Sequence, residues 1–344
     1  MSKKKNKYTS IELFAWAWWL ALWMEKSWFK HILLNDVDKY ATATLKRNRP
    51  EWNVLCQDIS TVDFTEYNWK IDLLAWWFPC QTFSYAWKRK WFEDVRWTMF
   101  FQFARAVKEV KPKVLLFENV KWLVSHDWWK TLKTIIEVLE DLGYTMFDYK
   151  VLSSLDYEVP QKRNRVIVIW VRKEYLVEYE YPEKIDKHYT LKDALKSGEL
   201  YNTDVPDSEW QEYNDEKKKI LKLVPPWGCW RNLPLEIQKS YMKKSFFLWW
   251  WKTWMARKIS WDEPSLTLTC SPAQKQTERC HPDEIRPFRV REYARIQTFP
   301  DSWIFEGSRN QQYKQIWNAV PVNLSYHIWK SLIKLLDKIY LNNK

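Results

Sequence analysis

Three features are scarce in this chain of 344 residues: glycine, paired cysteines and long apolar runs. The most apolar segment, 13–24, is 12 residues long, whereas a membrane-spanning helix needs about 20. No apolar signal-peptide core with a cleavage site follows the basic first residues, so neither membrane insertion nor secretion is expected. The 5 cysteines are an odd number without a C-x-x-C pair, which favours a reduced, cytoplasmic protein.

The shortage of glycine is matched by an excess of tryptophan. The chain has 4 glycines and 27 tryptophans, whereas ordinary usage puts glycine near about 7%. Some tryptophans form runs at expected turns, such as 249–251, where three indoles cannot all be buried. An aromatic-rich binding surface is one explanation. We favour another, in which 22 of them are UGA codons that the source lineage reads as glycine. These positions are Trp16, Trp18, Trp19, Trp23, Trp28, Trp69, Trp76, Trp77, Trp87, Trp91, Trp97, Trp122, Trp128, Trp129, Trp170, Trp227, Trp249, Trp250, Trp251, Trp254, Trp317 and Trp329.

Strand-like and helix-like segments alternate in the first half of the chain. Apolar runs predict strands at 10–14, 31–34, 71–75, 114–117 and 166–170. Helical spacing is found at 39–48, 99–110 and 131–142. Such alternation predicts an α/β fold with a doubly wound sheet. The alternation of strand-like and helix-like segments is absent from about 171 to 280, which predicts a second, smaller and irregular domain. A long amphipathic helix is expected at 322–341.

Polar residues follow the expected strands, where ligands of doubly wound sheets bind. Asp36 ends the second strand and suits a ribose hydroxyl, and Asp58 is placed to accept from an adenine amino group. Either carboxylate alone is more often a solvated surface group. With glycine at 16, 18 and 19, the segment 14–19 becomes a glycine-rich loop that a nucleotide-like cofactor could approach closely.

A second group of residues points to nucleophilic chemistry. Cys80 follows Pro79 in a loop after an expected strand, and Glu118 ends the neighbouring strand. Arg163 and Arg165 precede another strand and project to the same side if it alternates regularly. A thiol, a carboxylate and an arginine at one sheet edge form a constellation that chance seldom supplies, and the thiol is a candidate nucleophile.

Taken in chain order, these segments and several others resemble the motifs of the cytosine-C5 DNA methyltransferase family, and the resemblance covers nearly the whole chain. Almost every departure is tryptophan for glycine, so the chain as printed is expected to be a poor enzyme. The matching segments are 14–19 (F-x-G-x-G-G), Asp36, 58–59 (D-I), 77–81 (G-F-P-C-Q), 118–120 (E-N-V), 161–165 (Q-x-R-x-R), 291–300 (R-E-x-A-R-x-Q-x-F-P) and 317–321 (G-N-A-V-P).

The resemblance implies a Rossmann-like mixed sheet of the S-adenosylmethionine-dependent methyltransferase fold. It implies a catalytic and cofactor-binding domain at 8–175, a target recognition domain at 176–285, and a segment at 286–344 that returns to the catalytic domain. Cys80 would be the nucleophile, with Glu118, Arg163 and Arg165 assisting. S-adenosylmethionine would be held by Phe14, Trp16, Trp18, Trp19, Asp36, Asp58, Ile59, Pro79, Asn318 and Ala319.

The implied substrate is double-stranded DNA from which a cytosine is flipped out, and the net charge of +12 suits such a polyanion. A separately acting restriction endonuclease would be the partner in a restriction-modification system. A monomer without a metal is expected. Candidate DNA contacts are Lys252, Arg257, Lys258, Lys275 and Arg279.

Three alternatives stay open on the sequence. A tRNA cytosine-C5 methyltransferase would share the catalytic residues. A catalytically dead DNA-binding relative would follow if the tryptophans are genuine. A nicotinamide oxidoreductase also has a glycine-rich loop, but it does not need the motifs around Cys80, Glu118 and Arg165 together.

Overall fold

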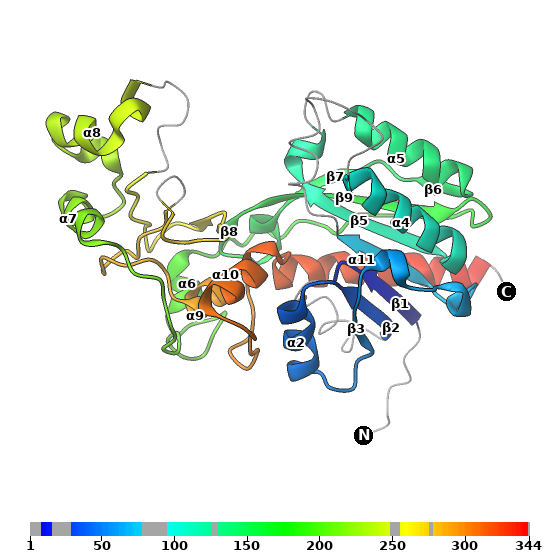
Figure 1. Cartoon of the computed structure of the whole chain (residues 1–344). Helices are drawn as coiled ribbons and strands as arrows, with labels where there is room; N and C mark the ends of the chain where they lie inside the picture. Colours follow the sequence, from blue (N-terminus) through cyan, green and yellow to red (C-terminus); the bar gives the residue numbers. More distant parts are fainter. Residues whose placement is uncertain are drawn as a thin grey trace. The chain divides into compact units, whose positions relative to one another are not determined.

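The computed structural model describes residues 8–15, 29–77, 95–124, 129–247, 255–274 and 278–342. They form two compact units (Figure 1). Unit 1 comprises the described residues of Met1–Ser153, Asn164–Lys184 and Leu324–Lys344, and unit 2 those of Ser154–Arg163 and Ile185–Asn323. The chain therefore enters unit 2 twice and ends in unit 1.

Unit 1 is built on an eight-stranded mixed sheet. Its order is β3 (Val54–Cys56), β2 (Phe29–Asp36), β1 (Tyr8–Leu13), β4 (Leu73–Trp77), β5 (Val114–Val120), β9 (Asn164–Arg172) and β6 (Tyr144–Met146), with β7 (Lys150–Ser153) also paired with β9. The first five strands run parallel, and β9 is antiparallel to β5, β6 and β7. The central strands are apolar on both sides because both faces are covered. The predicted doubly wound, Rossmann-like mixed sheet is confirmed.

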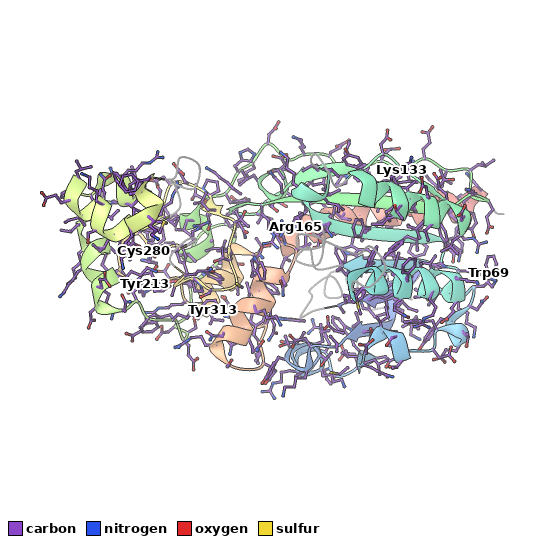
Figure 2. All side chains as sticks on the ribbon, turned by 45° about the horizontal axis from the view of Figure 1, so that its top comes forward. Trp69, Lys133, Arg165, Tyr213, Cys280 and Tyr313 are labelled. Carbon is purple, nitrogen blue, oxygen red and sulfur yellow. The ribbon has the colours of Figure 1, made fainter. Side chains whose placement is uncertain are left out.

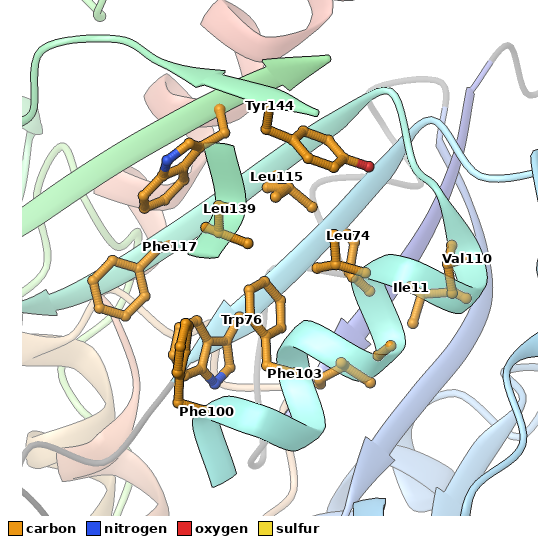
Figure 3. Close-up of a cluster of buried hydrophobic side chains, with 14 of the residues drawn as sticks. Ile11, Leu74, Trp76, Phe100, Phe103, Val110, Leu115, Phe117, Leu139 and Tyr144 are labelled. Atoms are coloured by element: carbon orange, nitrogen blue, oxygen red, sulfur yellow. The ribbon is translucent and has the colours of Figure 1, made fainter. Parts of the chain in front are cut away.

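Helices cover both faces of this sheet. Helices α4 (Val95–Val110) and α5 (Trp129–Asp141) cover one face, where Leu74, Phe103 and Leu139 belong to a single apolar cluster (Figure 3). Residues of β1 alternate between the faces. On the other face, the ring of Tyr340 in α11 (Val322–Asn342) lies 5.6 Å from that of Tyr8. Helix α2 (Lys39–Asn48), predicted at these residues, is capped by Asp38.

Unit 2 consists of short elements joined by loops, as expected for an irregular domain. Strands β8 (Gln161–Lys162) and β10 (Ser265–Leu266) pair in parallel. An apolar cluster that includes Leu221 and Tyr241 joins α7 to α8. The helices of this unit are α6 (Leu191–Leu195), α7 (Asp215–Leu223), α8 (Leu235–Met242), α9 (Val290–Ile296) and α10 (Arg309–Asn318). Short 3-10 helices in the two units are η1 (Ile59–Thr61), η2 (Thr65–Tyr67), η4 (Lys121–Val124), η5 (Ser154–Tyr157), η6 (Trp230–Asn232) and η7 (Lys243–Phe247). Within the described ranges, every helix is too short or too polar to cross a bilayer.

The buried carboxylate of Asp72 joins α11 to the starts of three strands. It accepts hydrogen bonds from the Thr9 backbone N–H at 2.8 Å, from Lys113 Nζ at 2.7 Å and from the Tyr340 hydroxyl at 2.7 Å. Thr9, Asp72 and Lys113 stand at or just before β1, β4 and β5. One side chain therefore fixes the last turns of the final helix against the amino-terminal edge of the sheet.

Replacing Asp72 by alanine is expected to lower the free energy of unfolding by about 3 kcal/mol, because the partly buried Lys113 cation, the Thr9 N–H and the Tyr340 hydroxyl lose their acceptor. Tyr340→Phe removes only one of these bonds and is expected to cost about 1 kcal/mol. Urea unfolding at pH 7 measures both values. Equal losses in the two variants would contradict a central role for Asp72.

Candidate active site

One edge of the unit 1 sheet carries most of those predicted site residues that the structure describes. Strands β1 to β5 run parallel, so their carboxyl ends meet at this edge, and the antiparallel β9 begins there. The strand register places Trp77, the last residue of β4, opposite Glu118 of β5. Arg165 of β9 is opposite Val120 of β5. The edge of the sheet therefore collects these side chains from segments that are far apart in sequence.

Glu118 and Arg165 form an ion pair at this edge. Arg165 Nε lies 2.7 Å from Glu118 Oε1, and each side chain is 10% exposed. Arg165 Nη1 also donates to the Asn164 carbonyl at 2.7 Å, which fixes the guanidinium plane. Arg165 is labelled in Figure 2. On adjacent antiparallel strands these two residues are diagonal neighbours, within reach of long side chains. The arrangement holds a nearly buried carboxylate in one orientation.

Two carboxylates lie at the carboxyl ends of β2 and β3. Asp36 is 5% exposed and accepts from the Asp38 N–H at 2.7 Å. Asp58 caps η1 and accepts from the Ser60 N–H at 2.8 Å and hydroxyl at 2.6 Å. These Ser60 bonds hold the pKa of Asp58 below its usual value. The Gln57 N–H donates to the Asp36 carbonyl at 3.1 Å and ties the two segments together. Two carboxylate acceptors at this edge suit a ribose hydroxyl and an exocyclic amine.

The described residues include only the start of the expected glycine-rich loop and do not include the Cys80 thiol. Phe14 has a left-handed backbone with φ +58°, and Ala15 N–H donates to the Asn35 carbonyl at 2.9 Å. Ile59 is buried in the apolar cluster of unit 1. The remaining predicted residues of this part, Trp16, Trp18, Trp19, Pro79 and Cys80, lie outside the described residues.

Arg163, Asn318 and Ala319 lie in unit 2. Arg163 is 2% exposed and donates from Nη2 to the Trp317 carbonyl at 2.8 Å. Asn318 is the last residue of α10, and the buried Ala319 caps its carboxyl end. The structure thus brings Arg163 to the segment that contains the other two. Gln161 and Gln297 were predicted only as letters of two motifs, but both are fully buried. Gln297 donates to the Ala319 carbonyl, and Gln161 donates to Gln297.

Arg279 does not fit the predicted role of a surface DNA contact. Its side chain is 4% exposed and donates to the carbonyls of Glu278 at 3.0 Å and Thr267 at 3.3 Å. Burial lowers the pKa of its guanidinium to about 10. Lys258 is also buried, and Lys252 and Lys275 lie outside the described residues. Arg279 therefore supports the interior of unit 2.

Two exposed tryptophans have backbones that favour glycine. Trp69 has φ +60° and Trp227 has φ +64°, and their side chains are 53% and 61% exposed. Left-handed backbone is costly for a bulky residue and free for glycine. At both positions the backbone supports the glycine interpretation.

Other members of the group of 22 occupy regular elements. Trp76 and Trp77 end β4, Trp170 lies in β9 and Trp329 in α11. The expectation of turn or loop sites is wrong at these positions. Trp76 stacks on Phe103 with ring centroids 4.2 Å apart (Figure 3). In the described part of the chain, the buried indole N–H groups of Trp170 and Trp329 have no acceptor, which costs about 1–3 kcal/mol each.

Comparisons with known proteins agree with these features. The family model described as C-5 cytosine-specific DNA methylase matches residues 8–334. The chain is 59% identical to the Type II methyltransferase M.Eco47II of Escherichia coli, over 97% of this chain and 81% of that protein. It is 57% identical to the Type II methyltransferase M.PspPI of Psychrobacter sp. (strain TA137), over 96% and 80%. Among solved structures, a Spodoptera frugiperda DNMT2 mutant has a TM-score of 0.69 at 16% identity, covering 95% of this chain and 100% of that one, which shows a shared fold.

Proposed function

Because the chain belongs to the C-5 cytosine-specific DNA methylase family and is a DNA cytosine methyltransferase, we propose the following reaction for it. A methyl group passes from S-adenosylmethionine to C5 of a cytosine flipped out of duplex DNA, through a covalent adduct with Cys80. The Glu118–Arg165 pair at the sheet edge is the observation that carries this proposal. Cys80 follows Trp77 by three residues, and Trp77 is the register partner of Glu118.

The cysteine performs the covalent step. As a thiolate, Cys80 adds to C6 of the base, and the displaced electron pair makes C5 nucleophilic. S-adenosylmethionine supplies the electrophilic methyl group that C5 takes. Loss of the C5 proton to a base then returns the electron pair and expels the Cys80 thiolate. The target carbon is inaccessible inside a stacked duplex, so the cytosine has to leave the stack.

Glu118 and the arginines stabilise the charge that develops on the ring. Glu118 holds a proton at N3 of the base as electron density rises there. Arg165 fixes the Glu118 carboxylate through the 2.7 Å contact and would contact the base carbonyl. By the family resemblance, Arg163 would assist this pair, and its guanidinium donates to the Trp317 carbonyl.

The cofactor would be held by carboxylates and backbone. Asp36 suits the ribose hydroxyls and Asp58 the adenine amino group, next to Ile59. Phe14, Pro79 and positions 16, 18 and 19 would border it in unit 1. By the family resemblance, Asn318 and Ala319 would also contact it.

The Type II relatives suggest the biological setting. We propose that the chain is the modification enzyme of a restriction-modification system and that it works as a cytoplasmic monomer beside a separate endonuclease. The target recognition region would lie within 176–285, between the catalytic domain at 8–175 and the returning segment at 286–344.

Bisulfite sequencing tests the reaction and its target together. The chain with glycine at the 22 positions (the glycine form) is expressed in cells that lack other cytosine-C5 methyltransferases. Full methylation of cytosine within one short sequence is expected. Purified enzyme is then given labelled S-adenosylmethionine with duplex DNA or with tRNA. Transfer to tRNA alone, or to neither by a folded and cofactor-bound protein, would overturn the proposal.

A further inference from the structure

Two buried glutamines form a hydrogen-bonded relay inside unit 2. Gln161 belongs to β8 and Gln297 ends α9, and neither is exposed to solvent. Gln161 Nε2 donates to Gln297 Oε1 at 3.0 Å, although the residues are 136 positions apart. Buried amides persist in proteins only with satisfied hydrogen bonds. The two side chains are therefore oriented by one another.

Backbone groups at both ends fix the direction of the relay. The Leu268 N–H, just after β10, donates to Gln161 Oε1 at 3.3 Å. Gln297 Nε2 donates to the carbonyls of Ile316 at 2.8 Å and Ala319 at 3.1 Å. Backbone N–H groups only donate and carbonyls only accept, so neither amide can flip without losing bonds.

The relay ends on the segment that carries predicted cofactor residues. Ala319 follows Asn318, and Arg163 binds the carbonyl of the preceding residue, Trp317, at 2.8 Å. The segment 161–163 therefore reaches 316–319 by two routes, one through Gln161 and Gln297 and one through Arg163. At the other end of the relay, Leu268 follows β10, which pairs with β8. Both Leu268 and β10 belong to the region proposed for target recognition.

We propose that Gln161 and Gln297 are positioning residues of the methyltransferase, which hold the Asn318–Ala319 turn against Arg163. This rests on the proposed function, because it assigns that turn to the cofactor and Arg163 to catalysis. Methionine side chains of similar volume would fill the same space, so stability alone does not require two amides. The two amides add hydrogen bonds whose donors and acceptors can pair in only one orientation. They select one geometry of the end of α10.

Methionine substitutions in the glycine form test this role. Gln297→Met leaves the carbonyls of Ile316 and Ala319 without their donor. It is expected to raise the dissociation constant of S-adenosylmethionine about tenfold, measured by calorimetry without DNA. Gln161→Met is expected to lower kcat about tenfold with a smaller effect on cofactor binding. The double variant should bind no more weakly than Gln297→Met, because the two residues act as one unit.

Gln315→Met is the matched control. Gln315 lies on the same α10, is 2% exposed and donates to the Glu306 carbonyl at 2.8 Å. Its loss is expected to lower Tm as much as the relay variants do while leaving cofactor affinity within twofold of the parent. Hydrogen exchange at 319–323 should accelerate in Gln297→Met and not in Gln315→Met.

The outcomes separate the two proposals. If the parent glycine form methylates DNA but Gln297→Met matches Gln315→Met in affinity and exchange, the positioning role is wrong. If the parent binds S-adenosylmethionine but transfers no methyl group, the proposed function fails. The exchange result at 319–323 still decides whether the relay fixes this turn.

Discussion

Replacement of Cys80 by serine in the glycine form is expected to lower the rate of methyl transfer to duplex DNA at least about ten-thousandfold. A serine hydroxyl is not ionised at neutral pH and adds poorly to C6, whereas a thiolate is a strong nucleophile. Transfer of labelled methyl groups under single-turnover conditions measures the loss. Cys270→Ser, at an exposed position, is the control and should keep the parent rate.

A trapping experiment identifies the attacking sulfur. With 5-fluorocytosine in the target, C5 carries no proton to lose, so the adduct cannot break down and survives denaturation. Peptide mapping is expected to find the base on Cys80. Cys280 is a poor rival, because burial raises the pKa of its thiol to about 12. Methylation by Cys80→Ser at the parent rate would refute the nucleophile assignment.

Replacement of Trp16, Trp18 and Trp19 by glycine in the printed chain is expected to tighten S-adenosylmethionine binding at least about a hundredfold. Three indoles in this loop would occupy the volume of a cofactor that needs close backbone approach. Equilibrium binding, measured on both forms of the chain, tests the gain. Equal affinities would show that the tryptophans are compatible with the site.

Two further substitutions separate recoded from genuine tryptophans. Trp227→Gly relieves a left-handed φ of +64° at an exposed position and should raise the free energy of unfolding by about 1 kcal/mol. Trp303→Gly removes a side chain that is 1% exposed and should lower it by about 3–5 kcal/mol. The gene decides independently, since the 22 codons should be TGA and those of Trp52, Trp210, Trp230, Trp261 and Trp303 should be TGG.

The sequence predicted the sheet well because parallel buried strands appear as apolar runs between helices. The end of β2 at Asp36 was predicted, whereas β5 runs past the expected end at Glu118 to Val120. The extension of β4 through Trp76 and Trp77 was not predicted, because a tryptophan interpreted as glycine suggests a turn. The burial of Arg279 was not predicted, because a charged residue is normally exposed and the sequence does not show that the Glu278 and Thr267 carbonyls accept from its guanidinium.

The glutamine relay could not have been predicted from spacing. Gln161 and Gln297 are brought together only by the folding of unit 2, and a single sequence gives no sign that an amide is buried. Its partners are backbone groups, which have no residue-specific signature in the sequence.

Helix α11, which covers one face of the unit 1 sheet, is translated after all the described strands of that sheet and after both parts of unit 2. Until translation reaches Tyr340, the nascent sheet exposes an apolar face and Asp72 lacks one of its donors. Premature termination anywhere after unit 2 would therefore yield a polypeptide with the catalytic motifs but an uncovered surface. Such a fragment should aggregate or be degraded, so partial synthesis produces no modifying activity.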